Sequence, residues 1–322
     1  MSEQSVVDIL GEPWLAETIS LPDDFEGEVV ATLVSRRHDE STQLATLHVH
    51  GFSDYFFHTE LADWWLEQGH DMYGLDLRKY GRSIRPHQSA TYVSDLDEYF
   101  DDLDAAWERI TVRDGHTRVV LSGHSTGGLV VALWAHERQP AELAGLVLNS
   151  PWLDLQGQAW ARSPVMDLVI DRVGRRHPMR ALPREVNGYY GRSLHRDHHG
   201  EWEFDLTWKP VESFPVRLGW LRAIREGHRR VRAGLSVAAP VLVLSSDRSG
   251  SPASMDHDDV FSSDIVLDVR QIRRWATSIG RHVTYAAIPG AVHDVVLSRP
   301  DARQHAYEEM RLWLDAYVHH DQ

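Results

Sequence analysis

Ser125 stands in a turn that can make its hydroxyl group a nucleophile. The segment 117–136 opens with a β-branched apolar run, turns at GHSTGG, and continues as an apolar, helix-compatible stretch. A glycine two residues before and two residues after the serine, between a strand and a helix, is the pattern of a nucleophile elbow. Such a turn strains the backbone and puts the hydroxyl at a helix N-terminus, where free N–H groups favour negative charge. The pattern predicts that Ser125 attacks a substrate; a plain glycine-rich turn is the alternative.

The elements that must position this serine alternate along the chain. Short apolar runs separated by segments of helical spacing are typical of a mostly parallel sheet covered on both faces. The first of these strands is expected to form a hairpin with what precedes it. The expected strands are residues 26–37, 44–51, 71–77, 119–121, 145–149, 240–246 and 283–288. The expected helices are residues 54–69, 92–110 and 302–318, together with the stretch that starts at Leu129.

One long segment lacks this alternation. Residues 151–234 contain no clear strand, and we expect them to form a helical cap inserted into a core made of residues 1–150 and 235–322. The region just after the first core part is rich in tryptophan. Either these rings line an acyl-binding pocket beneath the cap, or they form the cap's own small core. They are Trp152, Trp160, Trp202, Trp208 and Trp220.

Composition excludes several classes of protein. The chain has 33 basic and 48 acidic residues, a formal net charge of −15, so binding to nucleic acid or to anionic lipid surfaces is not expected. It has no cysteine, which excludes disulfides, thiolate metal sites and a cysteine nucleophile. No apolar run approaches the length of a membrane span, and the N-terminus lacks the pattern of a secretory signal. We expect a cytoplasmic monomer or homodimer that acts on a small molecule.

Four motifs in one order resemble the α/β-hydrolase superfamily. They are HGFSDYF at 50–56, LDLRKYGRS at 75–83, GHSTGG at 123–128 and PGAVHDVVLS at 289–298. The branch that they most resemble contains the lysophospholipase-like and monoacylglycerol-lipase-like hydrolases, which are grouped with serine aminopeptidase-type domains. The resemblance covers nearly the whole chain outside the expected cap. It implies an α/β-hydrolase fold and a Ser-His-Asp triad that works through an acyl-enzyme.

The resemblance also assigns the general base. In this superfamily the triad follows the chain order serine, acid, histidine. His293 lies in the loop GAVHD directly after the last expected strand, where that histidine belongs. We therefore expect His293 to take the proton of Ser125.

Three aspartates are candidates for the acid. The usual place is a turn shortly after the last strand but one; there Asp247 comes early, and Ser249 occupies the expected position. Further on, Asp264 and Asp268 stand in a D-x-x-x-D frame that resembles the lipase-like branch, in which the first aspartate is the acid. We expect Asp264, with residues 249–262 as an insertion that delays it, and Asp268 and Asp247 remain the alternatives.

The oxyanion hole of this superfamily uses two backbone N–H groups. By resemblance they are those of Thr126, which follows the nucleophile, and of Phe52, in the loop after the HG strand. Two neighbouring histidines, His50 and His124, are expected to shape the backbone and not to act on substrate.

Two histidine- and aspartate-rich stretches have the residue types of a metal site. HRDHHG at 195–200 and MDHDD at 255–259 lack the H-E-x-x-H spacing of zinc ligands, and both lie in polar, loop-like sequence. We expect them to be solvated surface, and we expect no metal and no cofactor.

The leading hypothesis is a serine hydrolase of carboxylic esters. Lipid-derived monoesters, such as monoacylglycerols or lysophospholipids, follow from the resemblance. An aminopeptidase-type amidase is the first alternative and needs a cap carboxylate for the substrate's ammonium group, for which Glu201, Glu203 or Asp205 could serve. A non-catalytic ligand-binding protein with the same fold is the second alternative.

Overall fold

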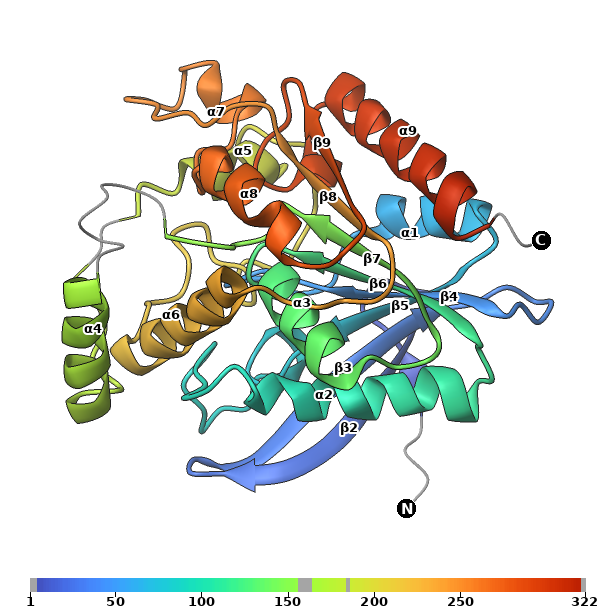
Figure 1. The fold of residues 1–322 in the computed structure, drawn as a ribbon, viewed down its shortest axis with the longest axis horizontal. Coiled ribbons are helices and arrows are strands. Elements are labelled where there is room, and N and C mark those ends of the chain that lie inside the picture. The colour runs from blue at the N-terminus through green and yellow to red at the C-terminus, as the bar shows by residue number, and fades with distance from the viewer. Residues whose placement is uncertain (1–4, 156–163, 184–185, 320–322) are drawn as a thin grey trace.

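A nine-stranded sheet forms the centre of the protein. The computed structural model describes residues 5–155, 164–183 and 186–319 (Figure 1). The strands run in the order β1-β2-β3-β5-β4-β6-β7-β8-β9, and from β5 through β4 to β9 every pair is parallel. Their bounds are Val6–Val7, Leu15–Asp24, Gly27–Arg36, Leu44–Val49, Asp71–Asp76, Arg118–His124, Leu143–Asn149, Val241–Ser246 and Val283–Ile288, from β1 to β9. The predicted mostly parallel sheet and the early hairpin, β2 with β3, are confirmed.

Helices cover both faces of this sheet (Figure 1). The side chains of α2, α3, α6 and α8 join the largest buried cluster on one face, and those of α1 and α9 join a second cluster on the other face. The α-helix bounds are Thr59–Glu67, Glu98–Glu108, Thr126–Arg138, Pro164–Arg176, Tyr189–Leu194, Leu218–Ala233, Asp259–Ser262, Val269–Trp275 and Pro300–Tyr317, from α1 to α9. The short helices are η1 Gly81–Ser83, η2 Arg109–Arg113, η4 Ala276–Ser278 and η5 Val295–Leu297.

The predicted helix at 54–69 begins later than its spacing indicated. Helix α1 starts at Thr59, because the residues before it are held in a loop by side chains from elsewhere. Asp76 at the end of β5 accepts the backbone N–H of Phe56 at 2.7 Å, and Asp54 accepts that of Tyr55 at 2.9 Å. These bonds hold Tyr55 and Phe56 in the loop that precedes the helix.

The segment between β7 and β8 contains three described helices, α4, α5 and α6. Helix α6 packs on α3 and contributes Trp220 and Ile224 to the largest buried cluster, so one face of it belongs to the core. The cap boundaries at 151 and 234 stay a prediction.

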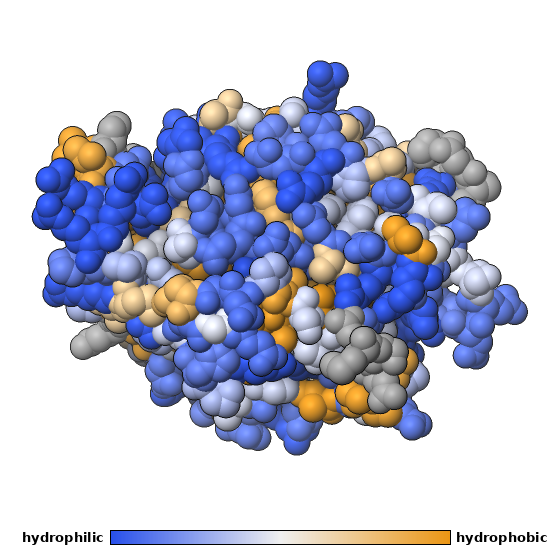
Figure 2. All heavy atoms as spheres, turned by 90° about the horizontal axis from the view of Figure 1, so that it is seen from below, coloured by the Kyte–Doolittle hydropathy of each residue, from blue (hydrophilic) through white to orange (hydrophobic). Residues whose placement is uncertain are grey.

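The surface agrees with the composition. The face seen from below is mostly hydrophilic, with small, separate apolar areas (Figure 2). Within the described ranges, no helix combines the length and the apolar character that crossing a membrane requires.

Candidate active site

Ser125 lies in a sharp turn between β6 and α3. Its backbone has φ 52° and ψ −113°, a region that side chains other than glycine rarely adopt. The flanking glycines explain how strand and helix approach so closely. A Cβ on Gly127 would lie 2.3 Å from the carbonyl oxygen of His50, and one on Gly123 would lie 2.8 Å from that of Gly127. Gly123 and Gly127 lie where two backbone segments are in contact, and their lack of a side chain allows the predicted elbow to form.

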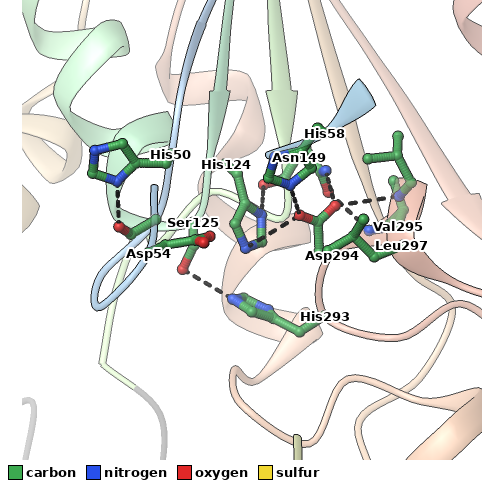
Figure 3. Close-up of polar contacts among 12 residues, drawn as sticks. His50, Asp54, His58, His124, Ser125, Asn149, His293, Asp294, Val295 and Leu297 are labelled. Atoms are coloured by element: carbon green, nitrogen blue, oxygen red, sulfur yellow. Dashed lines mark hydrogen bonds and ion pairs between the residues drawn. The ribbon is translucent and has the colours of Figure 1, made fainter. Parts of the chain in front are cut away.

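Three of the predicted side chains meet in one chain of hydrogen bonds. Ser125 Oγ lies 2.9 Å from His293 Nε2, and His293 Nδ1 lies 2.8 Å from Asp264 Oδ2. His293 points at the serine from the loop after β9 (Figure 3). All three residues are buried, Asp264 completely. The imidazole thus has a carboxylate on one nitrogen and the hydroxyl on the other, the geometry that transfers a proton from serine.

A local brace orients the Asp264 carboxylate. Its other oxygen, Oδ1, accepts the backbone N–H groups of Val266 at 2.8 Å and Leu267 at 2.7 Å. Ser249 forms a parallel bridge with Asp264, and its hydroxyl donates to the Leu267 carbonyl oxygen at 2.8 Å. The serine at the position where the acid was first expected therefore supports the loop that carries Asp264.

The two alternative aspartates have other partners. Asp247 is exposed, and its carboxylate accepts the Gly290 N–H at 3.4 Å. Asp268 is the N-cap of α8 and pairs with Arg270, whose hydrogen bond lowers the pKa of that carboxyl. Of the three aspartates left open by the sequence, Asp264 is the one that reaches His293.

The two predicted oxyanion donors border the serine. Thr126 is the first residue of α3, and the loop with Phe52 passes against the elbow, since a Cβ on Gly51 would lie 3.3 Å from Ser125 Cβ. Among the described residues, no protein acceptor takes the N–H of Phe52 or of Thr126. Both N–H groups are therefore unpaired within the part of the chain that the structure describes.

The neighbouring histidines hold backbone, as expected. His50 Nδ1 lies 2.8 Å from the carbonyl oxygen of Gly51, and its Nε2 accepts the N–H of Leu77 at 3.1 Å. His124 Nδ1 lies 3.2 Å from the carbonyl oxygen of Asn149, and burial lowers the pKa of His124 to about 4. The two imidazoles tie the loop after β4 and the elbow to their neighbours.

A buried carboxylate behind the site was missed by the sequence analysis. Asp294 accepts hydrogen bonds from His58 Nε2 at 3.0 Å and from Asn149 Nδ2 at 2.6 Å (Figure 3). Burial raises the pKa of Asp294, but the His124 imidazole and these hydrogen bonds outweigh burial, and the pKa falls well below its ordinary value. The carbonyl oxygen of Asn149 accepts the Ser125 N–H at 2.9 Å, so this network joins the histidine loop to the elbow. Its only sequence signal was the adjacency of Asp294 to His293.

A cavity of about 280 Å³ opens onto Ser125 and His293. Core and cap segments both line it. The lining residues are Phe52, Ser53, Asp54, His124, Ser125, Val186, Asn187, Gly188, Tyr189, Tyr190, Gly191, Lys209, Pro210, Val211, Ser213, Ile265, Val266 and His293.

The described tryptophans of the expected cap are not among these lining residues. Trp220 packs on Phe52 with ring centroids 4.3 Å apart, and Trp152 packs on Trp220 at 5.9 Å. Trp202 and Trp208 pack against a small cluster around Tyr55 and Phe204. Trp160 lies outside the described residues. These contacts favour packing, not acyl binding, as the role of the four described rings.

The metal-like stretches show local partners. His195 is buried, and its Nε2 lies 3.1 Å from the carbonyl oxygen of Phe204. Arg248 pairs with Asp259. Within the ranges that the structure describes, no three His, Asp or Glu side chains come together as metal ligands would.

Comparisons with known proteins identify the family of this chain. The hydrolase family described as serine aminopeptidase, S33, matches residues 41–299. Phospholipase YtpA of Bacillus subtilis (strain 168) is 31% identical over 109 residues, 34% of this chain; the match spans only 40% of that relative's length.

Solved structures share the fold. A monoacylglycerol lipase of Paleococcus ferrophilus superposes with a TM-score of 0.66 at 18% identity, covering 89% of this chain and 99% of that one. A soluble variant of the monoglyceride lipase of Saccharomyces cerevisiae, in complex with a substrate analogue, superposes with a TM-score of 0.66 at 15% identity, covering 94% of this chain and 97% of that one. The resemblance seen in the four motifs is thereby confirmed, as is the α/β-hydrolase fold. Because the family match extends over most of the chain, this protein belongs to the serine aminopeptidase S33 family of α/β-hydrolases.

Proposed function

We propose that this protein is a serine hydrolase of carboxylic esters. The observation that carries the proposal is the buried hydrogen-bond chain from Asp264 through His293 to Ser125. In this proposal Ser125 is the nucleophile, His293 the general base and acid, and Asp264 the group that orients the imidazole and stabilises its charged form. The backbone N–H groups of Phe52 and Thr126 stabilise the oxyanion.

The reaction has two halves. Ser125 Oγ attacks the ester carbonyl carbon while His293 Nε2 takes the hydroxyl proton, and the carbonyl oxygen becomes an oxyanion. The intermediate collapses, the C–O bond to the alcohol breaks, and His293 returns the proton to the departing alkoxide. A water then attacks the acyl-enzyme with His293 again as base, and the released acid leaves Ser125 protonated.

Lipid-derived monoesters are the proposed substrate class. The similar proteins are named as a phospholipase and as monoacylglycerol lipases, which supports this class. The cavity of about 280 Å³ is near the lower end of the range of about 300–1,000 Å³ for small-molecule sites. The ester series described below measures how acyl length affects hydrolysis.

The carboxylates considered for an aminopeptidase have other partners. Glu201 and Glu203 pair with Arg303 and Arg196, and the Asp205 carboxylate accepts the backbone N–H of Thr207 at 2.7 Å. None of the three is among the described residues that line the cavity. This arrangement favours an ester over a peptide with a free ammonium group.

A fluorophosphonate probe tests the proposal. The wild-type protein should be labelled at one site per chain, and Ser125→Ala should abolish labelling, because the probe phosphonylates an activated serine. p-Nitrophenyl esters of rising acyl length, set against amino-acid anilides, then measure the substrate class. Absence of labelling in the folded wild-type protein would leave a ligand-binding protein; faster anilide cleavage would make it an amidase.

A further inference from the structure

Three consecutive residues after Phe52 are each held by the segment between α5 and α6. Each of the three bonds joins a core side chain to a residue of the 205–214 stretch. The bonds are Ser53 Oγ accepting the Phe214 N–H at 3.0 Å, Asp54 Oδ1 pairing with Lys209 Nζ at 2.6 Å, and Tyr55 Oη accepting the Asp205 N–H at 2.7 Å. We call residues 52–55 the oxyanion loop. The 205–214 segment thus binds the oxyanion loop, which carries one proposed oxyanion donor.

Lys209 is the charged member of this grip. The chain has only two lysines, Lys79 and Lys209, and the side chain of Lys209 is 10% exposed. Its ammonium lies 5.4 Å from the ring centroid of Phe57 and 5.6 Å from that of Phe204. An ammonium withdrawn from water in this way needs a close anion, which Asp54 supplies.

Asp54 is charged in return. Burial raises the pKa of its carboxyl, but Lys209 and the surrounding imidazoles outweigh burial and bring the pKa down to about 2. The oxygen that pairs with Lys209 also accepts the Tyr55 N–H at 2.9 Å. The ion pair therefore fixes loop backbone and not only a side chain.

The loop has a backbone that needs such support. Ser53 has φ 54°, in the left-handed region that residues other than glycine rarely occupy, and it directly follows Phe52. Strained backbone of this kind persists only where surrounding contacts determine it. A small shift at Ser53 would move the Phe52 N–H away from the position where the oxyanion forms.

We propose that Lys209 is a positioning residue, which through Asp54 holds the Phe52 N–H in place for transition-state stabilisation. This inference rests on the proposed ester hydrolysis. Because the oxyanion donor acts on the transition state and not on the bound ester, loss of Lys209 should lower kcat and leave KM nearly unchanged.

Steady-state hydrolysis of p-nitrophenyl butyrate by Lys209→Met gives the first test. We expect kcat to fall about 10- to 100-fold, with KM within about 3-fold of wild type. Arg196→Met is the matched control: it also removes a cap cation with a carboxylate partner, Glu203, but that pair is exposed and does not touch the oxyanion loop. Its kcat should stay at the wild-type value.

Chemical rescue gives the second test and does not depend on how well Lys209→Met folds. The chain has no cysteine, so Lys209→Cys introduces the only thiol. With 2-bromoethylamine the thiolate displaces bromide and forms a thioether that ends in an ammonium at lysine's length. With iodoacetamide it displaces iodide and gives a neutral side chain of similar size. The ammonium should restore kcat at least several-fold more than the amide.

Three results would overturn the inference. The first is an unchanged kcat in Lys209→Met. The second is a rise in KM alone, which would make the Lys209 ammonium a substrate-binding group. The third is equal recovery of kcat with both reagents, which would mean that side-chain volume and not charge matters at position 209. Fluorophosphonate labelling of the wild-type protein separates the two proposals. If the wild-type protein is labelled and any of these results is found, only the role of Lys209 is refuted. If the wild-type protein is not labelled, both the ester hydrolysis and this inference are refuted.

Discussion

The two sides of Ser125 are held by different means. On the elbow and histidine side, backbone packs on backbone at Gly123 and Gly127, and the buried Asp294–Asn149 hydrogen bond ties the end of β7 to the loop after β9. On the oxyanion-loop side, hydrogen bonds and one ion pair from the 205–214 segment do the holding. The position of Ser125 thus depends on the sheet, whereas the position of the Phe52 N–H, the proposed oxyanion donor, depends on the 205–214 segment.

This difference predicts a ranking of effects. Changes on the elbow and histidine side should abolish chemistry or destabilise the fold. Changes on the covering side, the segments that lie over the oxyanion loop, should lower kcat without abolishing hydrolysis. Four experiments, taken from the largest expected effect to the smallest, test the ranking.

Asp264→Asn should have the largest effect. Without its charge the imidazole loses both its orientation and the stabilisation of its protonated form, and kcat should fall about 10³-fold or more. Asp247→Asn is the control and should keep wild-type kcat, because Asp247 is exposed and its carboxylate accepts a hydrogen bond from the Gly290 backbone. Steady-state ester hydrolysis measures both; an equal loss in Asp247→Asn would overturn the assignment of the acid.

Gly127→Ala tests the backbone packing. The new methyl group would meet the carbonyl oxygens of His50 at 2.3 Å and Val49 at 2.5 Å, and overpacking of this kind costs about 1–3 kcal/mol of unfolding free energy. Ester hydrolysis should fall with it, since the elbow must shift. Gly115→Ala is the control, because its new methyl group would meet no atom within 4 Å. This variant loses only the unfolding free energy that an alanine with positive φ costs, and it should keep its kcat. Denaturant unfolding with parallel kinetics distinguishes the two, and a Gly127→Ala protein as stable and as active as wild type would refute the packing argument.

Tyr190→Phe probes a contact from the covering side to the histidine loop. The hydroxyl accepts the Asp294 N–H at 3.1 Å, and the ring packs edge-on against His293. Removal of the Tyr190 hydroxyl leaves the buried Asp294 N–H unpaired, which costs about 1–3 kcal/mol of unfolding free energy. The ring still packs against the His293 imidazole. We expect kcat to fall less than about 10-fold. A loss as large as that of Asp264→Asn would show that the covering side also controls the histidine, and the comparison would fail.

The pH dependence of stability that Asp54 confers is the smallest of the four effects, and Asp54→Asn measures it. The folded pKa of Asp54, about 2, lies below its ordinary value of 3.8, so its carboxylate stabilises the fold fully above the unfolded pKa. This contribution is lost as the pH falls through the folded pKa. The difference in unfolding free energy between wild type and Asp54→Asn should therefore be constant above about pH 5 and shrink toward pH 2. A difference that grows on acidification would contradict the ion pair.

The sequence was sufficient wherever chemistry and local pattern coincide. The apolar runs predicted seven of the strands, and the glycine spacing around Ser125 predicted the elbow. The resemblance of the D-x-x-x-D frame to the lipase-like branch led to Asp264, which reaches His293 although its loop lies well beyond the end of β8.

Contacts between distant segments were not predictable in this way. Lys209 and Asp54 are 155 positions apart, as their numbers show, and no periodicity relates a cap residue to a core loop. The same holds for Asn149 and Asp294, which meet because β7, β8 and β9 are neighbours in the sheet. Helix α1 was predicted too long because its apolar spacing continues into a loop whose N–H groups bond elsewhere. Such pairings depend on register, which the linear pattern does not contain.

The backbone conformation of Ser125 has an evolutionary consequence. With φ at 52°, glycine would suit this position better than any residue with a side chain, and relief of such strain is worth of order 1 kcal/mol. A lineage selected only for a sturdier protein would therefore drift toward glycine here. A hydroxyl at this strained point of the turn therefore costs stability and serves the proposed reaction.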